Sequence, residues 1–128
     1  MKTQRASPVF IVDDSPLIRM RLAEMISAMS GMRLVGEAAS ASEAIAGINR
    51  TQPDSVLLDL NLLGHTGLEV LRAIRPHSPG IAFVVLTNHS EPQYRQACME
   101  AGAAYFLDKT RELGCVSAVL AEIAATRH

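Results

Sequence analysis

The sequence predicts an α/β domain in which one parallel sheet of five strands lies between two layers of helices. Short runs rich in β-branched residues alternate with longer stretches of helical period along the 128-residue chain, which is the pattern of a βαβ series. The third and fourth runs are apolar at consecutive positions, as expected when helices cover both faces of a sheet. The length suits one domain. We therefore expect a flexible lead over residues 1–7, the domain over residues 8–126, and no output domain.

The first part of the chain predicts two strands and a capped helix. Residues 9–12 form the first predicted strand. Ser15 can cap the following helix, and Pro16 suits its first turn because that position needs no amide hydrogen. The helical spacing of apolar residues ends at Gly31. Residues 33–38 form the second predicted strand.

The middle of the chain predicts a second helix, a third strand and a third helix. The second helix is expected to begin at Ser42. Residues 55–60 form the third predicted strand. Gly64 and Gly67 bracket a tight loop, after which residues 68–74 have the spacing of a short helix.

The last part of the chain repeats the alternation twice. Residues 81–86 form the most apolar predicted strand, and a helix over residues 91–101 is ended by Gly102. Residues 104–107 form the fifth predicted strand. Apolar residues on one side of residues 112–125 predict the final helix.

Composition limits the classes of function. The formal net charge of −1 argues against binding nucleic acid through a general basic field. Apolar residues make up 48% and charged residues 20%, which is typical of a soluble globular chain, and no apolar run approaches the roughly 20 residues that span a membrane. No apolar stretch accompanies the charged start, so we expect no signal peptide and a cytoplasmic location. Cys98 and Cys115 lack the paired spacing of a zinc site or a redox motif.

Polar side chains stand where the predicted strands end. They are Asp13, Asp14, Asp59, Thr87 and Lys109. Taken singly, each has an ordinary explanation as a loop acid near a helix start, a strand-end residue, a locally bonded hydroxyl or a solvated lysine. Parallel strands deliver their carboxyl ends to one edge of the sheet, where ligands bind. The set therefore predicts a phosphate-and-metal site.

Four short motifs carry these residues in order: Ile11-Val12-Asp13-Asp14, Leu57-Leu58-Asp59-Leu60, Val85-Leu86-Thr87-Asn88 and Phe106-Leu107-Asp108-Lys109. With this set, nearly the whole chain resembles the receiver domain of two-component response regulators, of the stand-alone single-domain type. The resemblance implies a flavodoxin-like (βα)5 three-layer sandwich with parallel strand order 2-1-3-4-5.

The residue types suit the chemistry that the resemblance implies. Asp59 is the candidate nucleophile, because a carboxylate can attack phosphorus and store the group as an aspartyl phosphate. Both reactants are anionic, so Mg²⁺ with hard oxygen ligands is expected between them. Lys109 would place a positive charge against the phosphoryl oxygens, and Thr87 would donate a hydrogen bond to one of them. Beyond this self-catalysed phosphorylation and dephosphorylation, we expect no enzyme activity.

The resemblance also implies a set of metal ligands. Asp14 and Asp59 would bind Mg²⁺ directly, and Asp13 mainly through water. The backbone carbonyl of Asn61 would complete the ligands that the protein supplies.

A switch and an output surface are implied in the same way. In the family, phosphorylation draws the threonine towards the phosphoryl group and an aromatic residue of the fifth strand moves into the vacated space; Thr87 and Phe106 match these positions. Tyr105 points to the opposite face of the strand, and plain core packing is the alternative role for Phe106. The surface of the fourth helix, fifth strand and fifth helix would then bind a partner. Candidate contacts are Arg95, Gln96 and Met99.

Three positions depart from the commonest family pattern. Asn88 stands where a small residue is frequent, Thr110 where a proline follows the lysine, and Leu63 where a proline is frequent in the acceptor loop. We expect Asn88 and His89 to crowd or polarise the route of an attacking water, and Asn61 to do the same from the other side. The sequence therefore does not predict the phosphoryl lifetime.

Expected partners are a histidine kinase or phosphotransfer protein and a downstream target protein, with a homodimer as a further option. Direct nucleic-acid binding and membrane insertion are not expected. Asn88 and Thr110 motivate an alternative, an interaction module that works without phosphorylation, and the strand order alone motivates a flavodoxin-like enzyme or FMN carrier. A phosphatase is disfavoured because Asn61 stands where a general acid would be needed. A receiver that is part of a longer regulator would show the same motifs.

Overall fold

A parallel sheet runs through the centre of the protein, which a computed structural model describes over residues 6–62, 65–88 and 91–127. Its strand order is β2-β1-β3-β6-β7, which is the predicted order 2-1-3-4-5 when only the sheet strands are counted. The flavodoxin-like topology is therefore confirmed. The strands are β1 (Ser7–Val12), β2 (Met32–Ala38), β3 (Ser55–Leu58), β6 (Ala82–Thr87) and β7 (Tyr105–Asp108).

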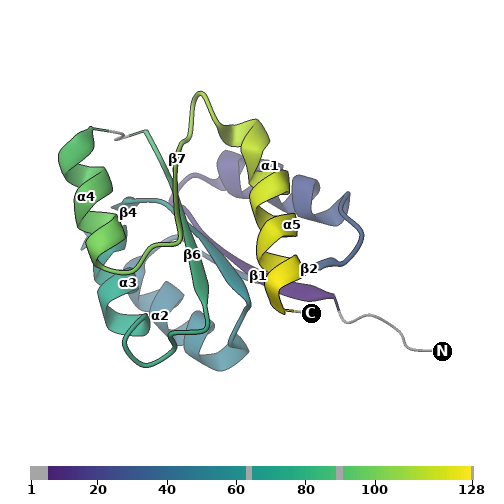
Figure 1. Ribbon diagram of the computed structural model, residues 1–128, viewed down its shortest axis with the longest axis horizontal. Coiled ribbons are helices and arrows are strands. Elements are labelled where there is room, and N and C mark those ends of the chain that lie inside the picture. Colours follow the sequence, from purple (N-terminus) through teal and green to yellow (C-terminus); the bar gives the residue numbers. More distant parts are fainter. Residues whose placement is uncertain (1–5, 63–64, 89–90, 128) are drawn as a thin grey trace.

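Helices cover both faces of the sheet, which confirms the three-layer sandwich (Figure 1). One face carries α1 (Pro16–Ser27) and α5 (Val116–Arg127), and the other carries α2 (Ala41–Thr51), α3 (Gly67–Ile74) and α4 (Pro92–Glu100). Successive residues of β1 feed the two cores in turn, so that Ile11 lies with α1 and α5 while Phe10 and Val12 lie with the other three helices. In the described part of the chain, no helix combines the length and apolarity needed to cross a membrane.

The first strand begins two residues earlier than predicted. Ser7 is buried, its amide donates to the carbonyl of Gly31 at 2.7 Å, and its hydroxyl donates to Asp54 at 2.7 Å. Gly31 has a φ of +85°, a conformation that glycine adopts without strain. The predicted lead over residues 1–7 lies mostly outside the described residues and stays a prediction.

The predicted caps differ in outcome between the first two helices. Ser15 caps α1 as expected, accepting a bond from the amide of Ile18 at 3.3 Å. The predicted start of the second helix at Ser42 is wrong, because Ser40 is the cap and accepts from the amide of Glu43 at 3.3 Å. The hydroxyl of Ser40 also donates to the Glu43 carboxylate at 3.1 Å. Only Ser40 has an acidic residue three positions later to pair with in this way.

A short hairpin that the sequence did not predict follows the third strand. β3 ends at Leu58, and β4 (Asn61–Leu62) then pairs antiparallel with β5 (His65–Thr66). Leu63 and Gly64, which belong to the predicted acceptor loop, lie outside the described residues. The amide of Gly67 donates to the carbonyl of Leu60 at 2.7 Å and folds the hairpin back onto the chain that follows the sheet.

The final helix is divided. A single 3₁₀ turn, η1 (Leu113–Cys115), precedes α5, whereas one continuous helix from residue 112 was predicted. The preceding strand, β7, places Phe106 in the core beneath α2, α3 and α4, while Tyr105 packs towards α5 and donates to Glu122 at 2.5 Å. The prediction that these two aromatic residues face opposite sides of the sheet is therefore confirmed.

Candidate functional site

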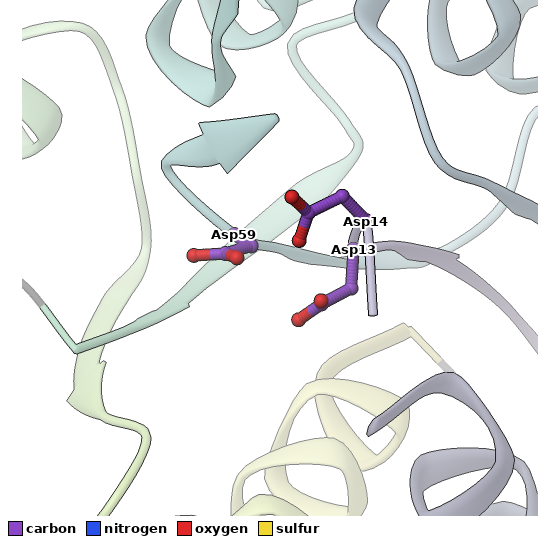
Figure 2. A group of neighbouring side chains, drawn as sticks. All are labelled: Asp13, Asp14 and Asp59. Carbon is purple, nitrogen blue, oxygen red and sulfur yellow. The ribbon is translucent and has the colours of Figure 1, made fainter. Parts of the chain in front are cut away.

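Three carboxylates meet where β1 and β3 end. The amide of Asp13 bonds the carbonyl of Ala38 at 3.0 Å, and the amide of Asp59 bonds that of Val12 at 2.9 Å. The regular pairing of the parallel strands thus extends to both aspartates and fixes their height at the sheet edge. Figure 2 shows Asp13, Asp14 and Asp59 grouped together, and carboxylate oxygens of the three lie within 4.8 Å of one another.

Lys109, which directly follows the edge strand β7, also reaches this cluster. Its ammonium Nζ donates to Asp13 at 2.7 Å and to Asp59 at 3.0 Å. Its own amide donates to the carbonyl of Thr87 at 2.8 Å, which continues the pairing of β6 with β7. The side chain of Lys109 is 10% exposed, and those of Asp13 and Asp59 are 2% and 5% exposed. Two buried carboxylates therefore share one buried cation.

Burial and charge oppose one another in the cluster. Burial raises the pKa of Asp59, and the nearby charge of Asp13 adds to this rise, although Lys109 acts against it. Burial alone would lower the pKa of Lys109, but its hydrogen bonds to Asp13 and Asp59 outweigh that effect and raise it. Lys109 therefore keeps its proton and its positive charge. One lysine still leaves the three carboxylates with an excess of negative charge.

The carboxylate cluster fits a hard divalent cation. Asp13, Asp14 and Asp59 offer only oxygen ligands, and the half-exposed Asp14 leaves the group accessible from one side. A buried excess of negative charge is unfavourable unless a cation compensates it. The backbone amide of Asn61 donates to the other oxygen of Asp59 at 3.3 Å, which places that residue of β4 directly against the cluster. The residues present are therefore suited to Mg²⁺.

Of the remaining predicted residues, Thr87 and Phe106 are buried, whereas those on α4 are exposed. Thr87 is the last residue of β6 and is fully buried, beside the chain that carries Lys109. Phe106 is 6% exposed, and the guanidinium carbon of Arg95 on α4 lies 5.8 Å from the centre of its ring. Gln96 and Met99 on the same helix are exposed. Phe106 thus connects the buried end of the sheet with the surface of α4.

Two residues that the sequence analysis did not assign to the site support its backbone. Arg19 on α1 donates from Nη1 to the carbonyl of Asp13 at 2.6 Å. Gly67 begins α3 so close to the site that an added Cβ would lie 2.0 Å from the carbonyl oxygen of Asp59. The second contact depends on the unpredicted hairpin. The first leaves no local pattern in the sequence, since it joins residues that are six positions apart across a loop.

The two described departures from the family pattern touch each other. The hydroxyl of Thr110 donates to the side-chain oxygen of Asn88 at 3.0 Å. Asn88 directly follows Thr87, and Thr110 directly follows Lys109. Asp108 orders the second of these segments by accepting from the amides of Thr110 and Arg111 at 2.9 and 3.0 Å. The loops that leave β6 and β7 are therefore bridged by side chains.

Comparison with known proteins gives a consistent result at the level of sequence. The family model of the response regulator receiver domain matches residues 9–120. Response regulator GacA from Pseudomonas viridiflava is 33% identical over 101 residues, which cover 79% of this chain and 47% of that protein. Response regulator UvrY from Escherichia coli (strain K12) is also 33% identical over 101 residues, covering 79% of this chain and 46% of that protein. The chain spans about half the length of these curated relatives.

Solved structures show the same similarity in three dimensions. The signal receiver domain of NarL from Mycobacterium tuberculosis has 27% identity and a TM-score of 0.87, with 94% of this chain and 98% of that chain covered. A two-component response regulator of the LuxR family from Aurantimonas sp. SI85-9A1 has 30% identity and a TM-score of 0.79, with 91% and 86% covered. The family match extends over most of the sequence, and the sheet order agrees with it. The chain therefore belongs to the response regulator receiver domain family.

Proposed function

We propose that the chain is a phosphoacceptor domain of a two-component pathway. Asp59 would take a phosphoryl group from a histidine kinase or a phosphotransfer protein. The observation that carries this proposal is the position of the Lys109 ammonium, 3.0 Å from Asp59 and 2.7 Å from Asp13. A buried cation at this point can stabilise charge that develops on a phosphoryl group beside Asp59.

The proposed reaction is a displacement at phosphorus. A carboxylate oxygen of Asp59 forms a bond to phosphorus while the bond between phosphorus and the donor nitrogen breaks. Lys109 then pairs with a phosphoryl oxygen, and the Thr87 hydroxyl donates a hydrogen bond to another. Mg²⁺ would supply charge neutralisation between the two anions. Asp14 and Asp59 would hold it directly, Asp13 through water, and Asn61 through its carbonyl.

The signal would leave the site through the buried end of the sheet. Movement of Thr87 towards the phosphoryl group would open space beside Phe106, whose ring contacts Arg95 on α4. The surface formed by α4, β7 and α5 would then change between two states and bind a target protein or a second copy of the chain. Exposed groups that could contact the partner are Arg95, Gln96 and Met99. The proposed place of action is the cytoplasm, without direct contact to nucleic acid.

Phosphorylation by a small donor tests the proposal directly. The protein is incubated with acetyl phosphate and Mg²⁺, and its intact mass is measured. We expect a gain of one phosphoryl group that disappears in Asp59→Asn and in the presence of a chelator. Asp54→Asn is the matched control, because Asp54 precedes β3 at the opposite end of that strand and bonds Ser7. A gain that persists in Asp59→Asn would refute the assignment of the acceptor.

A second candidate is an interaction module that works without phosphorylation. The contact between Thr110 and Asn88 favours it, since two departures from the common pattern meet at the mouth of the site. This candidate predicts no mass gain and no binding of beryllofluoride, together with partner binding that is unchanged in Asp59→Asn. Any beryllofluoride binding that depends on Asp59 would count against it.

A further inference from the structure

Arg19 makes two contacts that connect α1 with the loop of Asp13 and Asp14 and with β2. Its Nη1 donates to the carbonyl oxygen of Asp13 at 2.6 Å, and its Nε lies 3.3 Å from the carboxylate of Glu37 on β2. The side chain is 21% exposed, so both contacts are partly shielded from water. A guanidinium can satisfy two acceptors at once because its donors are fixed in one plane.

The carbonyl of Asp13 belongs to the peptide that joins the two acidic residues. The other polar groups of Asp13 are also held: its amide bonds Ala38 at 3.0 Å, and its carboxylate accepts from the amide of Ser15 at 2.9 Å and from Lys109 at 2.7 Å. Arg19 therefore completes the set of hydrogen bonds that hold Asp13. Its bond is the one that acts on the peptide group between Asp13 and Asp14.

The Asp14 side chain depends on that peptide for its direction. Within the part of the chain that the structure describes, its carboxylate has no hydrogen-bond or ion-pair partner. Its carboxylate lies beside those of Asp13 and Asp59 (Figure 2), and the backbone that carries Asp14 is the constraint on its direction that the described polar contacts provide. Groups outside the immediate ligands of a metal commonly orient those ligands in this manner.

We propose that Arg19 is a positioning residue of the phosphoacceptor site, which holds the peptide between Asp13 and Asp14 and so directs the Asp14 carboxylate towards the metal. The inference rests on the Mg²⁺-dependent function proposed above. It concerns a contact of this chain rather than the ligands themselves. Glu37 has a supporting part, because it fixes the guanidinium from the side of β2.

Charge and positioning predict opposite effects when Arg19 is removed. A positive charge near three carboxylates repels a divalent cation, so loss of the charge alone would strengthen Mg²⁺ binding. Loss of positioning would weaken it, because Asp14 would no longer be held in a ligand geometry. The direction of the change in affinity therefore separates the two roles.

Calorimetric titration of Mg²⁺ into the full chain, without any phosphodonor and at constant ionic strength, provides the test. We expect the Kd to rise about tenfold in Arg19→Met. A smaller rise is expected in Arg19→Lys, which keeps the charge but loses the planar fork. Arg21→Met is the matched control: Arg21 is exposed on the same helix, and its removal changes the charge equally without removing this contact. Its Kd should stay equal to that of the wild type or fall.

The outcomes distinguish this inference from the proposed function. Absence of Mg²⁺ binding in the wild-type protein would overturn both. Binding in the wild type with a Kd in Arg19→Met equal to or below that of Arg21→Met would overturn only the role of Arg19. If circular dichroism shows that Arg19→Met is unfolded, Arg19→Lys decides, since a Kd equal to the wild-type value would refute positioning.

Discussion

The buried environment of Asp59 works against the stability of the fold. Burial raises its pKa, so the charged form is less favourable in the folded protein than in the unfolded chain. A carboxyl group of this kind contributes stability below its unfolded pKa, near 3.8, and that contribution is lost as the pH rises through the raised folded value. At neutral pH the ionised Asp59 therefore works against folding.

Replacement of Asp59 by asparagine should stabilise the protein at neutral pH. We expect the thermal midpoint of Asp59→Asn to exceed that of the wild type by a few degrees at pH 7 in the absence of divalent cations. The difference should shrink as the pH falls below 3.8, the unfolded pKa, because Asp59 is then protonated in both the folded and the unfolded state. Thermal unfolding followed by circular dichroism across this pH range measures it. A wild type that is the more stable protein at pH 7 would contradict the argument.

Gly67 is needed for space rather than for an unusual backbone angle. An added Cβ would lie 2.0 Å from the carbonyl oxygen of Asp59, and backbone atoms cannot yield cheaply. We expect Gly67→Ala to lower the free energy of unfolding by about 1–3 kcal/mol and to slow phosphorylation of Asp59. Urea unfolding and the rate of mass gain with acetyl phosphate measure the two effects. Gly114→Ala, where nothing lies within 4 Å of the added atom, should change neither.

At the scale of elements, β1, β2 and α2 are locked together around one ring. Phe10 is 1% exposed, and its ring lies between Gly36 on β2 and Gly47 on α2. A Cβ at Gly36 would approach the ring to 2.5 Å, and one at Gly47 would approach it to 2.6 Å. The close approach of helix and strand therefore requires glycine on both sides of this phenylalanine.

A double-mutant cycle can measure this lock. Overpacking should lower the free energy of unfolding of Gly47→Ala by about 1–3 kcal/mol. The higher helix propensity of alanine, roughly 1 kcal/mol above that of glycine, should offset this loss only in part. In the background of Phe10→Leu, which removes ring atoms from the contact, the same change should cost less or become favourable. Equal effects in both backgrounds would show that the ring is not responsible. Gly80→Ala, in open space, is the control for unfolding measurements in denaturant.

The elements also show what the sequence could and could not reveal. Hydrophobic periodicity identified the sheet strands and the helices because each signal lies within one segment. The hairpin of β4 and β5 was not predicted, because strands of two residues are too short to show an alternation of apolar and polar residues. The hairpin also depends on the hydrogen bond from Gly67 to Leu60, which has no local pattern in the sequence. The α2 start was misplaced because Ser40 and Ser42 are equally good caps until the partner at Glu43 is considered.

At the scale of the whole molecule, the site is assembled from residues far apart in the sequence. Lys109 bonds an aspartate 96 positions away and another 50 positions away. The parallel topology made this convergence predictable, because every strand ends at the same edge. The role of Arg19 was not predictable, since it depends on how α1 is rotated over the loop and on the place of Glu37 in β2.

Binding of Mg²⁺ to this assembled site should stabilise the entire fold. A ligand that binds only the folded state adds stability by mass action, about 2.7 kcal/mol at a concentration one hundred times the Kd. We expect the thermal midpoint to rise with Mg²⁺ concentration in the wild type and to stay constant in Asp14→Asn. Asp14 is only half-buried, so this variant should fold. Potassium chloride at matched ionic strength controls for screening, and an equal rise with that salt would argue against a specific site.

The bond between Thr110 and Asn88 has a mechanical consequence. It adds a side-chain rung beyond the last backbone bond of β6 and β7, between Lys109 and Thr87. This side-chain bond links the two segments, so a displacement of one is transmitted to the other. We expect a partner protein that binds one of these loops to displace both Thr87 and Lys109. Amide resonances of both loops should then shift together in an NMR titration, and Thr110→Val should make them shift independently.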